Sequence, residues 1–332
     1  MTEAQRIFSG IQPTGYIHLG NYLGAVRRWV DQQSEFDSFF CIVDLHAMTL
    51  PWDPKELQER SVATGAMLLA CGIDPTQATL YLQSHVPAHS ELAWVLSCIA
   101  RMGELRRMVQ FKEKSKGETE SVGVGLFTYP VLQAADVLLY RAHGVPVGED
   151  QRQHVELMRD IATRFNSQLG EVFVLPEAWI PAAGARIMSL DDPSSKMSKS
   201  ANRPNSAILL EDKPEVIAKK IRSAVTDSGR EVTASPDKPA VTNLLTIYSV
   251  LAGESIAAVQ ERFVGKGYGD LKVALADVVV AALSPLRERY EELMADPAET
   301  ARLLAIGAAR ASEVAATTMA DVRRAAGLVP PA

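Results

Sequence analysis

Two lysines three residues apart belong to the most specific chemical string in the chain, Lys196-Met-Ser-Lys-Ser200. The string follows a polar, turn-forming stretch that begins at Asp191, so we expect it to lie in a loop. Two ammonium groups on one loop can both reach a polyphosphate, and closure of the loop would confine their charge stabilisation to the reactive state. For an arbitrary pair of lysines at this spacing, a solvated surface loop would be the better interpretation.

A second stretch, residues 6–21, has the composition of an anion site. Apolar Ile7, Phe8 and Ile11 predict a buried strand, and a helical pattern begins at Leu19. A glycine-containing loop between them ends at His18. The first N–H groups of a helix lack intrahelical partners and carry partial positive charge, so an anion binds there readily. Many strand-to-helix turns carry glycines only for tight geometry, so this stretch alone leaves the question open.

One carboxylate interrupts an apolar helical pattern. Asp136 lies within the run from Thr128 to Tyr140, which predicts a buried helix. An unpaired carboxylate in such a place would be costly. Asp136 therefore needs a partner, either from the protein or from a ligand.

Alternating strands and helices must position these groups. Apolar runs predict strands at 6–11, 39–44, 79–84 and 145–147, and helices are predicted from 53 to 71, from 90, over 128–140 and after 151. This alternation predicts an α/β fold, a Rossmann-like doubly wound parallel sheet. Ligands bind beyond the C-terminal ends of such strands, where Gln12, His46 and Ser84 lie. Residues 101–125 suggest a basic helix and a mobile loop, or equally a solvated helix face and a disordered connection.

Beyond the lysine loop, helical patterns dominate to the end of the chain. We therefore expect two domains. Residues 1–203 would form the Rossmann-like catalytic domain, which includes the loop 196–200. Residues 204–332 would form a smaller all-helical domain, whose long alanine-rich last helix could pack back on the first domain.

Composition narrows the class of protein. The 332 residues are 47% apolar and 22% charged, which is ordinary for a globular protein. The net charge of −6 argues against non-specific binding to nucleic acid, and DNA is not an expected partner. Three cysteines without a C-x-x-C pair favour free thiols in a reducing compartment. No apolar run is long enough to cross a membrane, and the first strand leaves no room for a signal peptide, so we expect a cytoplasmic protein.

Several ordered strings resemble those of class I aminoacyl-tRNA synthetases, and specifically of bacterial-type tryptophanyl-tRNA synthetases. They span most of the chain. The strings are Phe8-Ser-Gly-Ile-Gln-Pro-Thr-Gly15, His18-Leu-Gly-Asn21, Asp44-Leu-His46, Gln110-Phe-Lys-Glu-Lys114, Tyr129-Pro, Ala134-Ala-Asp136, Val147-Gly-Glu-Asp-Gln151, Lys196 to Ser200, Ala224-Val-Thr-Asp-Ser228 and Gly267-Tyr-Gly269. Each string is weak alone, but their ordered sum is close to decisive.

The resemblance implies an ATP site shared by the first loop and the lysine loop. The catalytic residues would be His18, which lies near the phosphates, and Lys196, Ser198 and Lys199, which stabilise the leaving pyrophosphate with Mg²⁺. A histidine at this position could otherwise be a helix-entry residue bonded to its own turn. The residues implied to bind ATP are Gln12, Pro13, Thr14, Gly20, Asn21, Gly148, Glu149, Asp150, Ile187, Lys196, Met197, Ser198, Lys199 and Ser200.

The resemblance also gives Asp136 a partner, the indole N–H of L-tryptophan, because this donor requires an acceptor. Tyr129 and Gln151 would hold the ammonium and carboxylate of the amino acid. Phe8, His46, Val145 and Val147 would form the pocket walls. The alternative is that protein donors cap Asp136.

The chain departs from the family at two points. Gln133 stands where methionine is common against the indole, which could alter packing in the pocket. Asn21 replaces the final histidine of the first signature, as is tolerated in the tryptophan and tyrosine branches. Some relatives hold an iron–sulfur cluster near the C-terminal domain, but no cysteine follows Cys98, so we expect no cluster.

The implied activity is tryptophan–tRNA ligation through tryptophanyl-adenylate, with tRNA(Trp) as acceptor and a homodimer formed around residues 101–108. One alternative is tyrosyl-tRNA synthetase, although the short N-terminal lead-in and Ala224 to Ser228 favour tryptophan. A second alternative is a paralogue that acts mainly as a regulatory binding partner, against which the intact His18, Asp136, Lys196 and Lys199 count. A small nucleotidylyltransferase would not explain the helical C-terminal part.

Overall fold

A five-stranded parallel sheet forms the centre of the N-terminal half, and its strand order is β3-β2-β1-β4-β5. The computed structural model describes residues 5–109, 123–180, 186–198 and 205–329. The strands are β1 (Arg6–Ile11), β2 (Asp37–Ile42), β3 (Thr79–Leu82), β4 (Gly144–Pro146) and β5 (Glu177–Trp179). This order confirms the predicted Rossmann-like sheet and puts its topological switch point between β1 and β4. β5 was not predicted, because its three residues are partly exposed and form no apolar run.

Successive residues of a strand point to opposite sides of the sheet, so both faces of this sheet carry apolar side chains. Helices cover both faces. Ile7, Phe40 and Leu80 belong to one buried cluster, while Phe8, Phe39 and Tyr81 belong to another. The helices of this half are α1 (Leu19–Asn21), α2 (Arg27–Gln32), α3 (Asp44–Ala47), α4 (Pro54–Ala70), α5 (Ala88–Ser97), α6 (Met102–Leu105), α8 (Val124–Leu138) and α9 (Arg152–Leu169), with a π-helical turn at Tyr22–Val26 between α1 and α2.

The predicted start of α4 near residue 53 is confirmed. Asp53 is the N-cap, and its carboxylate accepts the backbone N–H of Glu56 at 2.8 Å, with Pro54 in the first turn. Helix α6 is the described part of the predicted basic helix, and the exposed residues Arg101, Arg106 and Arg107 flank it. Residues 110–122 lie outside the described residues.

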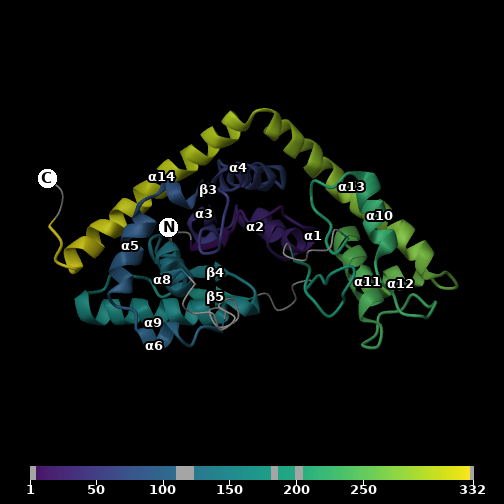
Figure 1. Cartoon of the computed structure of the whole chain (residues 1–332), viewed down its shortest axis with the longest axis horizontal. Coiled ribbons are helices and arrows are strands. Elements are labelled where there is room, and N and C mark those ends of the chain that lie inside the picture. The colour runs from purple at the N-terminus through teal and green to yellow at the C-terminus, as the bar shows by residue number, and fades with distance from the viewer. Residues whose placement is uncertain (1–4, 110–122, 181–185, 199–204, 330–332) are drawn as a thin grey trace.

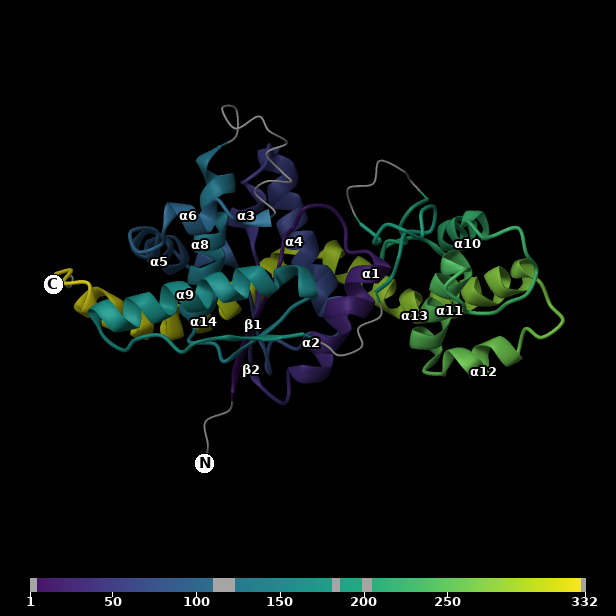
Figure 2. The ribbon, with the colours of Figure 1, turned by 90° about the horizontal axis from the view of Figure 1, so that it is seen from below.

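The C-terminal half is helical, as predicted, and two long helices join it to the sheet. Its helices are α10 (Pro214–Ser223), α11 (Pro239–Ala252), α12 (Ile256–Glu261), α13 (Tyr268–Ala295) and α14 (Pro297–Ala325). α13 packs on α10 and α11, and α14 then returns across β3, α4 and α5. Figure 1 shows α13 and α14 meeting at an apex above the other elements, and Figure 2 shows α10 to α12 gathered at the end of the molecule opposite α5 and α6.

Specific contacts fasten α14 to the sheet. Arg323 forms an ion pair with Glu91 of α5 (Nε to Oε1 2.7 Å). Gly307 lies so close to β3 that a Cβ there would be 1.9 Å from the carbonyl oxygen of Leu80. The expected domain boundary at 203/204 falls at the edge of residues 199–204, outside the described residues. Within the described part of the chain, no helix is both long and apolar enough to cross a membrane.

Candidate active site

Asp136 is the best-connected buried carboxylate of the described chain, and it projects from the middle of α8. Only 1% of the residue is exposed. Its Oδ2 accepts from Nε2 of His46 at 2.8 Å. Its Oδ1 accepts from Nδ1 of His89 and from Nε2 of Gln83, both at 2.6 Å. The cost of burying this carboxylate is thus offset by three donors from three different elements.

These donors keep Asp136 ionised. Burial alone would raise its pKa, but hydrogen bonds from His46 and His89 outweigh burial and lower the pKa from 3.8 to about 2. Each carboxylate oxygen has about two acceptor positions. Oδ1 already has two donors, so the remaining capacity lies on Oδ2.

Tyr129 and Gln133 lie on the same face of α8 as Asp136, because the spacings of four and three residues match the helix period. The Tyr129 hydroxyl is 3.0 Å from Nε2 of His154 on α9. Gln133 donates to Oε1 of Gln151 at 3.2 Å, and Gln151 donates in turn to Asp150. The side chains predicted to surround tryptophan are therefore brought together, with the amide of Gln133 turned to Gln151.

The other predicted wall residues lie at the centre of the sheet. Phe8 of β1 stacks on Tyr140 with ring centroids 5.9 Å apart. Val145 is 3% exposed, and half-buried Val147 follows β4. Phe8, Val145 and Val147 belong to one packed cluster. His46 follows β2 and meets the ring of Tyr129 edge-on at 6.2 Å.

The first signature forms a short self-capped turn. His18 is the N-cap of α1, and its Nδ1 accepts the backbone N–H of Asn21 at 3.2 Å. The Asn21 side chain accepts the N–H of His18 in return. This is the helix-entry arrangement that the sequence left open beside a catalytic role. Since Nδ1 accepts, the hydrogen of a neutral His18 ring is on Nε2.

The lysine loop lies directly against this turn. A Cβ on Gly20 would lie 3.1 Å from the His18 ring and 3.3 Å from Cβ of Met197. The segment after the loop pairs with the same turn, since Leu19 donates to Ile208 and Leu210 donates to Ile17. Two signatures far apart in the sequence are therefore neighbours in space.

Within the loop, backbone bonds set which side chains face outward. Met197 is 2% exposed, and its N–H bonds to the carbonyl of buried Ile187. Lys196 is exposed and Ser198 half-buried. Met197 and Ile187 are both buried in the core, and their contact with ATP stays a prediction. Lys199 and Ser200 lie outside the described residues.

The remaining predicted ATP residues lie beyond two adjacent strands. Gln12, Pro13 and Thr14 follow β1, and Gly148, Glu149 and Asp150 follow β4. Because β1 and β4 pair at Ile7 and Gly144, both segments lie at the switch point, where such folds bind ligands. Nε of Arg152 donates to Oε1 of Glu149 at 2.6 Å.

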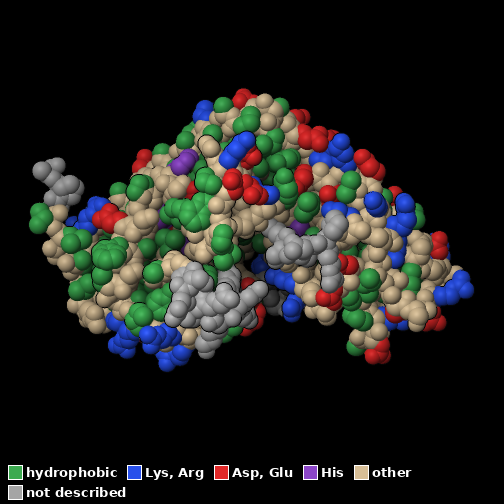
Figure 3. Space-filling model, in the orientation of Figure 1, with side chains coloured by type: hydrophobic (Ala, Val, Ile, Leu, Met, Phe, Trp, Pro, Cys, Tyr) green, Lys and Arg blue, Asp and Glu red, His purple; other side chains and the backbone are tan. Residues whose placement is uncertain are grey.

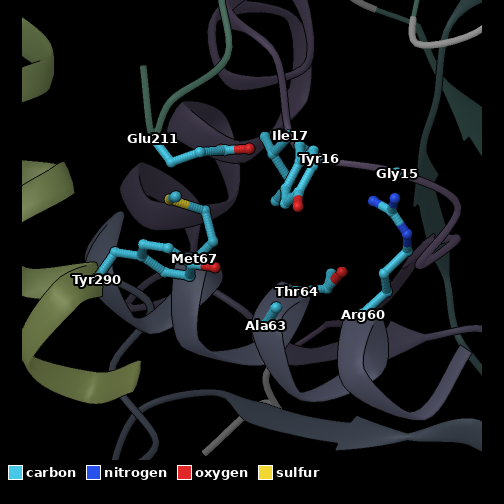
Figure 4. A pocket seen from close by; sticks show the side chains of 9 residues that line it. All are labelled: Gly15, Tyr16, Ile17, Arg60, Ala63, Thr64, Met67, Glu211 and Tyr290. Carbon is cyan, nitrogen blue, oxygen red and sulfur yellow. The ribbon is translucent and has the colours of Figure 1, made fainter. Parts of the chain in front are cut away.

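Two cavities lie near the junction of the two halves. A cavity of about 10 Å³ lies between the loop after β1, α4 and α13, and Figure 4 shows Arg60, Glu211 and Tyr290 around it. That volume holds about one water, too little for a substrate. An open cavity of about 530 Å³ lies between Met188 at the base of the lysine loop and Asn243 of α11. Asn243 is bonded to both backbone groups of Met188, so its polar groups are occupied.

Three site residues were missed by the sequence analysis. Gln83 and His89 bond Asp136, and His154 bonds Tyr129. Gln83 closely follows the apolar run of β3, the position where ligand-facing groups are expected. His89 and His154 gave no signal, since a histidine within a helix gives no indication of its spatial partner.

The model of the family "tRNA synthetases class I (W and Y)" matches residues 1–284 of the 332. The tryptophan–tRNA ligase of Caldanaerobacter subterraneus is 53% identical over 98% of this chain and 99% of its own. The chain belongs to the bacterial tryptophanyl-tRNA synthetases of this family. The family model covers both the tryptophan and the tyrosine enzymes, and the full-length relative is named as a tryptophan enzyme.

Solved structures of the family agree with the fold. The tryptophanyl-tRNA synthetase of Mycoplasma pneumoniae superposes with a TM-score of 0.89 at 37% identity, covering 98% of both chains. That of Campylobacter jejuni, complexed with ADP and tryptophan, gives 0.85 at 37% identity, covering 98% of this chain and all of that one.

Proposed function

We propose that this chain, a tryptophan–tRNA ligase, uses the α8 face to select tryptophan and the switch point to bind ATP. The carboxylate of tryptophan attacks the α-phosphorus of ATP to give tryptophanyl-adenylate and pyrophosphate. A ribose hydroxyl at the 3′ end of tRNA(Trp) then accepts the amino acid, and AMP leaves. The nucleophiles belong to the substrates, so the protein's task is positioning and charge stabilisation. The single observation that carries the proposal is the buried, ionised Asp136 with acceptor capacity left on Oδ2.

Asp136 supports selection of tryptophan by a simple argument. The indole N–H is a donor without acceptor capacity, and a carboxylate is its strongest partner. Phenylalanine would fill the space but leave Oδ2 without that bond, which a buried polar group does not tolerate cheaply. In the proposed pose Tyr129 and Gln151 hold the α-ammonium and carboxylate, while Phe8, Val145 and Val147 contact the ring.

ATP would lie across the start of α1. Its adenosine would contact the segments after β1 and β4, and its phosphates would face Nε2 of His18. Lys196, Ser198 and Lys199 would hold the leaving pyrophosphate. Mg²⁺ usually binds through substrate phosphates and waters, so we propose that it enters with ATP. The neighbour from Campylobacter jejuni was solved in complex with ADP and tryptophan, which supports binding of both kinds of ligand.

The remaining parts of the chain suggest how the substrates meet. We propose residues 1–203 as the catalytic domain and 204–332 as the anticodon-binding domain, with α14 connecting the second to the first.

We also propose a homodimer through α5 and α6, where Trp94 is 72% exposed and Met102 57% exposed. Lys and Arg side chains gather beside α6 and α9 in Figure 3, a surface suited to RNA phosphates. Because tRNA and ATP are cytoplasmic substrates, we place the protein in the cytoplasm.

The test is ATP–pyrophosphate exchange with each standard amino acid. We expect exchange with tryptophan and rates lower by ~10⁴-fold or more with tyrosine and phenylalanine. In Asp136→Ala the preference over phenylalanine should collapse, whereas Asp160→Ala, an exposed aspartate on α9, should keep it. An Asp136→Ala enzyme that stays as selective as the wild type would show that the indole acceptor lies elsewhere.

A further inference from the structure

The two oxygens of Asp136 are not equivalent. Oδ1 accepts from His89 and Gln83 at 2.6 Å each, whereas Oδ2 accepts from His46 alone among the described residues. His46 also meets the ring of Tyr129 edge-on, so Oδ2 is the oxygen on the side of the α8 face that binds substrate in our proposal. Filling Oδ1 leaves one orientation in which the carboxylate has a free acceptor position.

His89 reaches Asp136 from the second position of α5 and is wholly buried. An ionised carboxylate only accepts, so Nδ1 of His89 carries a hydrogen. On the other side of the ring, Nε2 lies 2.9 Å from the hydroxyl of Tyr140 and 3.2 Å from that of Tyr81. The ring is therefore held at both nitrogens.

The two tyrosines are suited to fix that ring. Burial raises the pKa of both Tyr81 and Tyr140, so their hydroxyls keep their protons. A neutral His89 with hydrogen on Nδ1 has one acceptor position at Nε2, and the Tyr140 hydroxyl is the nearer donor to it. Tyr140 also stacks on Phe39 with ring centroids 4.5 Å apart, which holds its hydroxyl in place. Tyr81 of β3 and Tyr140, just after α8, thus fix the tautomer and orientation of His89, and His89 in turn orients the carboxylate of Asp136.

We propose that His89 is a positioning residue for tryptophan recognition: with Gln83 it fills Oδ1 of Asp136 and so leaves the open position of Oδ2 for the indole N–H. The inference rests on the proposed role of Asp136 as indole acceptor. His89 is not itself a substrate contact in this account. A supporting shell that fixes a recognition group in one geometry is what selective sites require.

Removal of His89 has a specific expected effect. Oδ1 of Asp136 would then accept from Gln83 alone. The carboxylate could rotate, and the open acceptor position would no longer be fixed on Oδ2. Tryptophan should bind more weakly, and the preference for a ligand with N–H should fall. His89 bonds Asp136, Tyr81 and Tyr140, none of which we propose to hold ATP, so the kcat of adenylate formation and the KM for ATP should change little.

The test uses L-3-benzothienylalanine, in which sulfur replaces the indole N–H at nearly the same shape. The measured quantity is the ratio of kcat/KM for tryptophan to that for the analogue in ATP–pyrophosphate exchange. We expect a ratio of ~100 or more in the wild type and a fall of at least ~10-fold in His89→Leu, carried mainly by the KM for tryptophan. His89→Asn should retain most of the ratio, because its amide N–H can replace Nδ1–H.

Controls separate the possible failures. His85→Leu, at an exposed histidine just before α5, should leave the ratio unchanged. If His89→Leu does not fold, Tyr140→Phe, which removes one hydroxyl at Nε2, should lower the ratio in the same direction. A folded His89→Leu with the wild-type ratio, while Asp136→Ala loses it, would overturn the role of His89 alone. A wild-type ratio near one would overturn the role of Asp136 and with it this inference.

Discussion

At the scale of single residues, the need for a partner at Asp136 could be predicted, but the partners could not. An apolar pattern around a carboxylate is visible in the sequence, and the cost of burial requires compensation. Which groups compensate depends on where α3, α5 and the end of β3 meet, which is tertiary information. The sequence offered protein donors and a ligand donor as alternatives. The structure shows three protein donors and, in addition, capacity for one more.

The ionisation of Asp136 predicts a defined pH window for stability. Its pKa falls from 3.8 to about 2 on folding, so the folded state is stabilised above the unfolded pKa, and this contribution is lost as pH drops toward the folded pKa. We expect the stability gap between wild type and Asp136→Asn to be constant above about pH 5 and to shrink between about pH 4 and 2. Urea unfolding of both proteins across this range measures the gap. A gap that grows on acidification would contradict the assignment.

At the scale of elements, periodicity located the strands and helices wherever a buried face was long enough. β1, β2 and β3 and helices α4, α9 and α14 all follow from it. β5 was missed because its residues are partly exposed and form no apolar run, whereas the equally short β4 has buried Val145. Gly144 of β4 lies against the ring of Trp179, a contact without a local signal in the sequence. The π-helical turn after Asn21 also escaped prediction, since one extra residue per turn leaves the apolar pattern nearly unchanged.

The close packing of α14 on β3 at Gly307 can be tested by substitution. Gly307→Ala would put Cβ 1.9 Å from a backbone oxygen, so helix or strand must shift, and we expect a loss of ~3 kcal/mol or more in unfolding free energy. Gly269→Ala, in α13 with open space around it, should stabilise by up to ~1 kcal/mol through helix propensity. Urea unfolding midpoints compare the two. Equal midpoints for both variants would show that α14 does not press on β3.

At the scale of the whole molecule, the chain brings its two most diagnostic strings together although nearly the whole catalytic half separates them. Recognition of the family implied a shared ATP site, whereas composition and periodicity could not place the lysine loop. The structure shows that the lysine loop lies against the first turn: residues 17–19 pair with residues 208–210, and Met197 lies close to Gly20. α13 and α14, which form the arch of Figure 1, then connect the helical bundle back to the sheet.

The most direct test of a shared ATP site is to add one methyl group between the first signature, residues 18–21, and the lysine loop, residues 196–200. The quantity measured is the rate of ATP–pyrophosphate exchange. Gly20→Ala would press on the His18 ring and on Met197, so we predict a fall of ~10-fold or more in kcat/KM for ATP with little change in the KM for tryptophan. Gly24→Ala, one turn later with no atom within 4 Å of its Cβ, should be near wild type. Equal activity of the two variants would contradict a single ATP site built from both signatures.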